Sequence, residues 1–168
     1  VQDVSSLRNF LAHYQTQILL PVEWPAIKCA QIHGAGNELR ELISLDQELA
    51  HEPVLAHFAA PSRRVGRAQL QKLRPLRDQR IVQRYLRAVE SGQAHGWHTL
   101  VYGLTLALYS LPLRQGLLGY AHQTTRGFIY SAARMFQLSE RDCRAIFEDL
   151  CAPLPQTLAS MLCEESVL

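Results

Sequence analysis

The sequence of 168 residues has little of several features that would assign it to a special class of protein. Its four cysteines include no Cys-x-x-Cys pair, so it predicts neither a zinc knuckle nor a redox motif. Its net charge of +2, from 17 basic and 15 acidic residues, excludes disorder caused by self-repulsion. The longest uncharged apolar run, residues 99–113, is too short to cross a bilayer. We expect reduced thiols, no membrane span and a location in the cytoplasm.

Motifs that carry catalysis are also missing. The sequence has no Gly-x-Ser-x-Gly, no phosphate-binding Gly-x-x-x-x-Gly-Lys, no Gly-x-Gly-x-x-Gly after a strand and no paired-carboxylate motif. His95 and His98, in the segment His-Gly-Trp-His, could hold a metal only if other ligands came near. These absences favour a protein that is not an enzyme and binds no cofactor or metal directly. A helical enzyme or ligand carrier built around residues 99–136 stays open as an alternative.

The apolar residues recur at helical spacing nearly everywhere, and no segment alternates as a strand would. The connections between the periodic segments are short. The sequence therefore predicts an all-α fold, a single compact helical domain of about eight or nine helices over residues 1–168.

Several residues predict where these helices start and stop. Asn37 and Ser139 are expected to cap helix N-termini. Pro21 and Pro25 are expected to end the first helix, and Pro61 to kink a later one or to mark the junction of two helices. Four glycines inside helical segments predict close approaches between helices, namely Gly103, Gly116, Gly119 and Gly127.

Charge is divided between two neighbouring segments. Residues 38–52 are acidic, whereas nine of the 17 basic residues fall between Arg63 and Arg87. The basic stretch lacks interleaved aromatic residues and a helix-turn-helix signature, so we interpret it as a solvated face or a charged protein interface. The alternative is a helical nucleic-acid-binding or regulatory domain that uses the basic stretch of residues 63–87.

One polar stripe is predicted on an otherwise apolar helix. His122, Arg126, Tyr130 and Arg134 follow one another at intervals of four, which places them on one side of a helix. Arginine and tyrosine often supply the energy of protein–protein contacts. The stripe therefore indicates a partner-binding face, with a buried hydrogen-bond network or a solvent edge as the equal alternative.

Three stretches resemble the urease accessory protein UreF family when taken in order. They are residues 6–19, residues 38–50 followed by 61–70, and residues 98–142. The second keeps the family's serine, arginine, glycine and leucine pattern at Ser62, Arg64, Gly66 and Leu70, with Arg67 also common there. The third keeps the family's pattern of a histidine and a valine followed by a serine, two alanines and an arginine, at His98, Val101, Ser131, Ala132, Ala133 and Arg134.

The family's N-terminal motif has no counterpart in this sequence, so the resemblance is to a divergent or N-terminally truncated member. It implies a non-catalytic, all-helical adaptor that binds UreD (also called UreH) and the GTPase UreG on apo-urease. It further implies a homodimer and a nickel ion handled by the wider complex, with no nucleic acid or membrane as partner. His98 joins the four stripe residues as a candidate contact, while Ser62 and Gly66 are interpreted as helix-packing positions.

Overall fold

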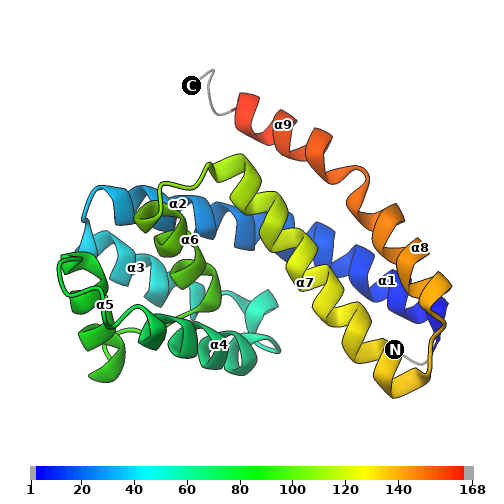
Figure 1. The fold of residues 1–168 in the computed structure, drawn as a ribbon, viewed down its shortest axis with the longest axis horizontal. Coiled ribbons are helices and arrows are strands. Elements are labelled where there is room, and N and C mark those ends of the chain that lie inside the picture. The colour runs from blue at the N-terminus through cyan, green and yellow to red at the C-terminus, as the bar shows by residue number, and fades with distance from the viewer. Residues whose placement is uncertain (1–2, 165–168) are drawn as a thin grey trace. The chain divides into compact units, whose positions relative to one another are not determined.

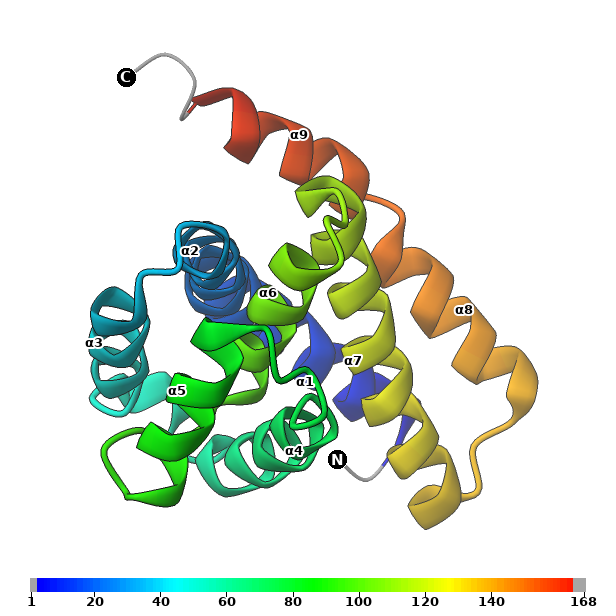
Figure 2. The same ribbon diagram turned by 60° about the vertical axis from the view of Figure 1, so that its left-hand side comes forward.

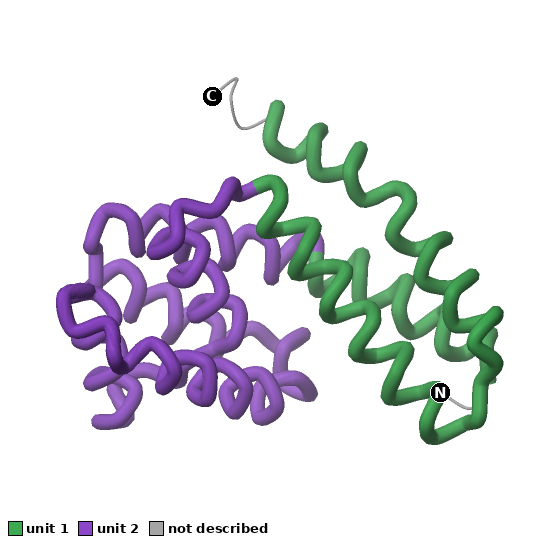
Figure 3. The backbone as a smooth tube through the Cα atoms, in the orientation of Figure 1, with its two compact units in different colours: residues 1–19, 114–168 green, residues 20–113 purple. Residues whose placement is uncertain are grey.

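The computed structural model describes residues 3–164, and these form helices and turns without a strand. The predicted all-α class is confirmed. The chain divides into two compact units, residues 1–19 with 114–168 and residues 20–113 (Figure 3). Each unit is described by itself below, and the interpretation of residues 1–168 as a single domain stays a prediction. No helix in the described part of the chain is long and apolar enough to cross a membrane.

The first helical run continues where the sequence predicted a break. Helix α1 (Val4–Tyr14), a π-helical segment (Gln15–Glu23) and α2 (Trp24–Ala35) follow one another without interruption. The expectation that Pro21 and Pro25 end the helix is therefore wrong. Pro21 lies in the π-helical segment, whose wider turn accommodates a residue without an amide donor, and Pro25 stands in the first turn of α2. This continuity joins α1 and α2 into one helical run, so residues 3–164 hold eight separate α-helical runs besides the 3₁₀ turn.

The unit of residues 20–113 is built around α6 (Figures 1 and 2). Helix α6 packs between α2 and α4, while α3 packs against α2 and α5. Besides α2, the helices of this unit are α3 (Leu39–Leu49), a 3₁₀ turn (Pro53–Leu55), α4 (Ala59–Lys72), α5 (Arg80–Glu90) and α6 (His98–Leu108). At the α2–α6 contact, a Cβ atom on Gly103 would lie 2.4 Å from the carbonyl oxygen of Ile27. The predicted close approach at Gly103 is confirmed.

Two local features of this unit differ from the simplest expectation. Asn37 does not cap α3, because Glu38 stands at the N-cap and Asn37 takes a positive φ of 56° in the turn before it. Of the two outcomes expected at Pro61, the kink is absent, and the residue lies instead at the start of α4, which begins at Ala59 after the 3₁₀ turn. A proline in the first turn of a helix costs little, since the amide that it lacks would have no partner within the helix.

The other unit consists of α1, α7 (Leu113–Phe136), α8 (Glu140–Cys151) and α9 (Leu154–Glu164) (Figure 1). Its buried cluster contains Leu7, Leu11, Ile129, Ala132 and Ile146. Ser139 caps α8 as predicted, because its hydroxyl accepts a hydrogen bond from the amide of Asp142 at 3.1 Å. By contrast, a Cβ atom on Gly127 would meet nothing within 4 Å, so the predicted close approach there is wrong.

Candidate protein-binding surfaces

The predicted stripe lies on α7, the long helix of residues 113–136. Arg126, Tyr130 and Arg134 are exposed, with 66% of Tyr130 accessible, while His122 is half-buried. Between the stripe residues in the sequence, α7 buries Thr125, Ile129 and Ala132. Because the stripe is exposed over most of its length, it is not the buried hydrogen-bond network that the sequence left open.

The arginines of the stripe stack on aromatic rings. The guanidinium carbon of Arg126 lies 4.8 Å from the ring centroid of Phe147 on α8, and that of Arg134 lies 5.8 Å from the ring of Tyr130. The His122 ring also lies 5.7 Å from the Phe147 ring. Within residues 3–164, neither arginine has a carboxylate partner. The stacking orders the side chains while leaving their N–H donors available.

A groove of about 580 Å³ lies beside this stripe, between α7 and α8. Its lining is mostly apolar and includes Ile129, Leu138 and Phe147, together with Arg126 and Tyr130 of the stripe. An apolar groove next to arginine and tyrosine side chains has the composition of the central part of a protein–protein interface. We call the stripe and this groove together the α7 surface.

His98, the fifth candidate contact, belongs to the other unit. It is the first residue of α6, where its amide donates a hydrogen bond to the Ser62 hydroxyl at 3.2 Å. Its imidazole is half-buried, with the ring 6.2 Å from that of Tyr102. Burial lowers the pKa of His98, so the ring is neutral near pH 7. His98 therefore contributes to packing within its own unit, and its role as a partner contact stays a prediction.

The family-motif positions on α4 mainly hold the segment that precedes α6. A Cβ atom on Gly66 would lie 2.1 Å from the carbonyl oxygen of Gly96, so only glycine permits this approach. Arg67 donates from Nε to the carbonyl of His95 at 2.9 Å. The Ser62 hydroxyl accepts the hydrogen bond from the amide of His98, whereas Arg64 is exposed. The packing interpretation of Ser62 and Gly66 agrees with these contacts.

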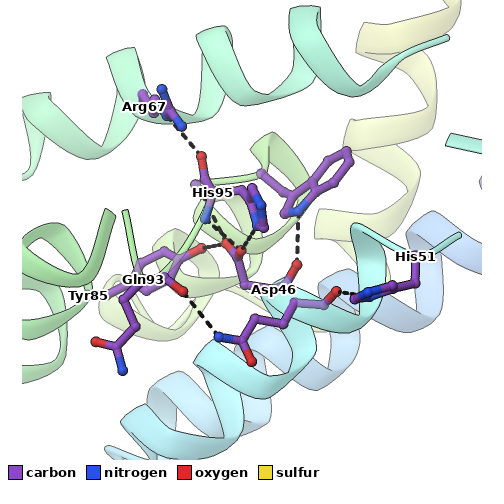
Figure 4. A network of polar contacts seen from close by, with 9 residues as sticks. Asp46, His51, Arg67, Tyr85, Gln93 and His95 are labelled. Carbon is purple, nitrogen blue, oxygen red and sulfur yellow. Dashed lines mark hydrogen bonds and ion pairs between the residues drawn. The ribbon is translucent and has the colours of Figure 1, made fainter. Parts of the chain in front are cut away.

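The polar centre of this unit is a residue that sequence reasoning missed. Asp46 on α3 is 0% exposed, and its carboxylate accepts four hydrogen bonds (Figure 4). Oδ1 accepts from the amide and the Nδ1 of His95 at 2.6 and 2.9 Å. Oδ2 accepts from the Tyr85 hydroxyl at 2.6 Å and from the amide of Gly96 at 2.9 Å. The backbone carbonyl of Asp46 accepts from Trp97 Nε1 at 3.0 Å.

This arrangement, which we call the Asp46 network, is a structural anchor. Burial, and then the charge of Asp46, raises the pKa of Tyr85 well above its ordinary value, so its hydroxyl stays a donor. The network joins α3, α5 and the segment before α6 in one fully paired cluster. A signal for it was present in the sequence, because Leu42, Asp46 and Leu49 share the buried face of α3 at spacings of four and three.

The segment His95–His98 offers no metal centre in the part of the chain that the structure describes. No group of three or more His, Cys, Asp or Glu residues there could hold a metal ion. The Nδ1 atom of His95 is used by Asp46, and the amide of His98 by Ser62. His95 therefore holds the segment before α6 to α3, and His98 holds the start of α6 to α4.

Comparison with known proteins finds one family model that matches most of the chain. The model for UreF matches residues 1–151, which include α1 to α8 and so both units. A urease accessory protein UreF from Actinobacillus pleuropneumoniae is 22% identical over 128 residues. That match covers 76% of this chain and 56% of the relative, so the chain spans about half the length of the curated protein that it resembles.

Proposed function

Because the chain belongs to the UreF family, we propose that it is a urease accessory protein acting as an adaptor in nickel-dependent urease maturation. In this role it binds UreD (UreH) and the GTPase UreG on apo-urease, in the cytoplasm and as a homodimer. UreF proteins are accessory proteins, and family membership supports the expectation that the chain is not an enzyme. Nickel is handled by the wider complex, with no ion held by this chain.

The α7 surface is the observation that carries this proposal. Its arginines have no carboxylate partner within the described chain, and a guanidinium pairs bidentately with a carboxylate on another protein. Tyr130, which is 66% exposed, adds a large apolar ring with a polar hydroxyl at its tip. The groove beside them gives a partner side chain an apolar place to be buried. An adaptor needs such a surface and needs no catalytic group.

A single substitution tests this assignment. Arg134→Ala removes one guanidinium from the exposed end of the stripe and leaves the buried face of α7 unchanged. We expect the variant to fold normally and to retain UreD and UreG from the same source about tenfold more weakly, because one charge-assisted contact is lost. Co-purification of the three proteins, with the native mass of the variant alone, measures both partner binding and self-association.

Arg141→Ala is the matched control, since Arg141 is exposed on α8 of the same unit and belongs neither to the stripe nor to the lining of the groove. This control should retain both partners as the unsubstituted chain does. If Arg134→Ala also retains both partners and the unsubstituted native mass, Arg134 makes no partner contact and the assignment of the α7 surface is wrong.

A further inference from the structure

The basic stretch of residues 63–87 has two parts, one with arginines that contact other residues of the unit and one whose arginines are exposed on α5. Three arginines of its first part are used within the unit. The guanidinium carbon of Arg63 lies 4.5 Å from the ring centroid of Trp97, and Arg67 donates to the carbonyl of His95. Arg74 forms an ion pair with Glu90 and donates from Nε to Gln71 at 3.0 Å. Part of the positive charge that suggested nucleic acid therefore serves the fold.

The second part leaves three arginines on the outer face of α5. Arg80, Arg84 and Arg87 are all exposed, and none has a carboxylate partner within residues 3–164. Their spacing of four and three places them in one row, which we call the α5 arginine row. At a rise of about 1.5 Å per residue, the row is about 10 Å long. The opposite face of α5 is buried through Ile81, Val82, Tyr85, Leu86, Ala88 and Val89.

A polar groove lies beside the middle of the row. It has a volume of about 550 Å³ and is lined by Arg84 of α5 and, from the start of α3, by Glu38, Arg40 and Glu41. Negative charge therefore stands next to the arginines on the same surface. A phosphate backbone carries negative charge along its whole length, so it would be repelled by Glu41, which has no ion-pair partner within residues 3–164, whereas Glu38 contacts His33. A protein helix, by contrast, can carry carboxylates only at the positions that face the arginines.

We propose that the α5 arginine row is a docking surface for an acidic helix of a protein partner. The complementary helix carries Asp or Glu at positions i, i+4 and i+7, so that each carboxylate meets one guanidinium in a charge-assisted, bidentate contact. Next to them, a neutral or basic side chain of the partner enters the groove beside Glu41. The row lies on α5 in the unit of residues 20–113, whereas the α7 surface belongs to the other unit.

A pair of synthetic peptides tests the proposal on the whole chain. One is an alanine-based helical peptide with glutamate at i, i+4 and i+7, and the other carries glutamine at the same positions. Fluorescence anisotropy of the labelled peptides measures binding at low and at physiological salt. We expect the glutamate peptide to bind about tenfold more tightly than the glutamine peptide at low salt, with the difference falling as salt screens the exposed charges.

Two charge-matched variants locate the binding. Arg84→Glu with Arg87→Glu reverses two charges of the row, and Arg114→Glu with Arg141→Glu makes the same change in net charge at exposed positions in the other unit. We expect the first variant to bind the glutamate peptide about tenfold more weakly and the second to bind it as the unsubstituted chain does. Circular dichroism confirms that both variants are folded.

Four results would overturn the proposal. Equal binding of the two peptides excludes recognition of carboxylates, and equal loss in the two variants shows only an effect of net charge. Tighter binding of a DNA duplex than of the glutamate peptide makes nucleic acid the better ligand. A change of native mass from dimer to monomer in the Arg84→Glu, Arg87→Glu variant identifies a second copy of this chain as the occupant.

Discussion

The Asp46 network and the α7 surface use the same kinds of side chain in opposite ways. In the network, an aspartate, a tyrosine and a histidine satisfy one another inside the unit of residues 20–113. On α7, arginine, tyrosine and histidine stand at the surface, and the two arginines contact aromatic rings without a carboxylate partner in the described chain.

The difference teaches which polar residues hold this fold and which are available to another molecule. A buried carboxylate is tolerated only when its lone pairs are filled, and Asp46 fills them with four donors. An exposed arginine already has water as a partner, so its removal costs the fold little. The two regions should therefore respond very differently to substitution, and three measurements can break or sharpen that contrast.

The largest effect is expected from Asp46→Ala. The substitution leaves the buried Tyr85 hydroxyl and Gly96 amide, and both donors of the half-buried His95, without their acceptor. We expect the free energy of unfolding to fall by about 3–5 kcal/mol, as it does when one partner of a buried charged network is removed. Urea denaturation measures the change. Glu41→Gln, exposed on the same helix, is the control and should change stability by less than about 0.5 kcal/mol. Equal effects of the two substitutions would contradict the anchoring role of Asp46.

Two glycine substitutions, one in each unit, are expected to change stability by an intermediate amount and in opposite directions. In Gly66→Ala, the new Cβ would lie 2.1 Å from the Gly96 carbonyl oxygen, so backbone must move and stability should fall by about 2–3 kcal/mol. In Gly127→Ala, the new methyl group meets nothing within 4 Å, and α7 should gain about 1 kcal/mol of helix propensity. Thermal or urea denaturation of the two variants measures whether the free energy of unfolding falls in Gly66→Ala and rises in Gly127→Ala. If Gly66→Ala is neutral, α4 does not approach the segment before α6 so closely.

The candidate site on α7 could be predicted from the sequence because its geometry depends on one helix alone. Once residues 113–136 are helical, the spacing of His122, Arg126, Tyr130 and Arg134 fixes their common side. The Asp46 network depends on three segments instead, and the sequence does not say that Tyr85 and His95 meet α3. Asp46 belongs to the acidic segment of residues 38–52, but its position between Leu42 and Leu49 indicates the buried face of α3.

The helical class was predictable for a similar reason, while the effect of individual prolines was not. Apolar spacing is repeated over the whole chain, so many residues support the same conclusion. Whether Pro21 ends a helix depends on how the turn around it widens, and the structure resolves this with a π-helical segment. The effect of Pro61 depends on where α4 begins, and a start at Ala59 places Pro61 in the first turn of the helix.

The smallest effect on stability is expected from Arg126→Ala, and it sharpens the comparison most. Its guanidinium stacks on Phe147 and has no carboxylate partner in the described chain, so truncation loses only an exposed cation–π contact. We expect the free energy of unfolding to fall by about 0.5–1 kcal/mol, far less than for Asp46→Ala, in the same urea experiment. A loss of 3 kcal/mol or more (about the lower bound for a buried charged network) would show that α7 uses its arginines as the other unit uses Asp46. The α7 stripe would then belong to the fold, and the partner-binding role would have to lie elsewhere on the chain.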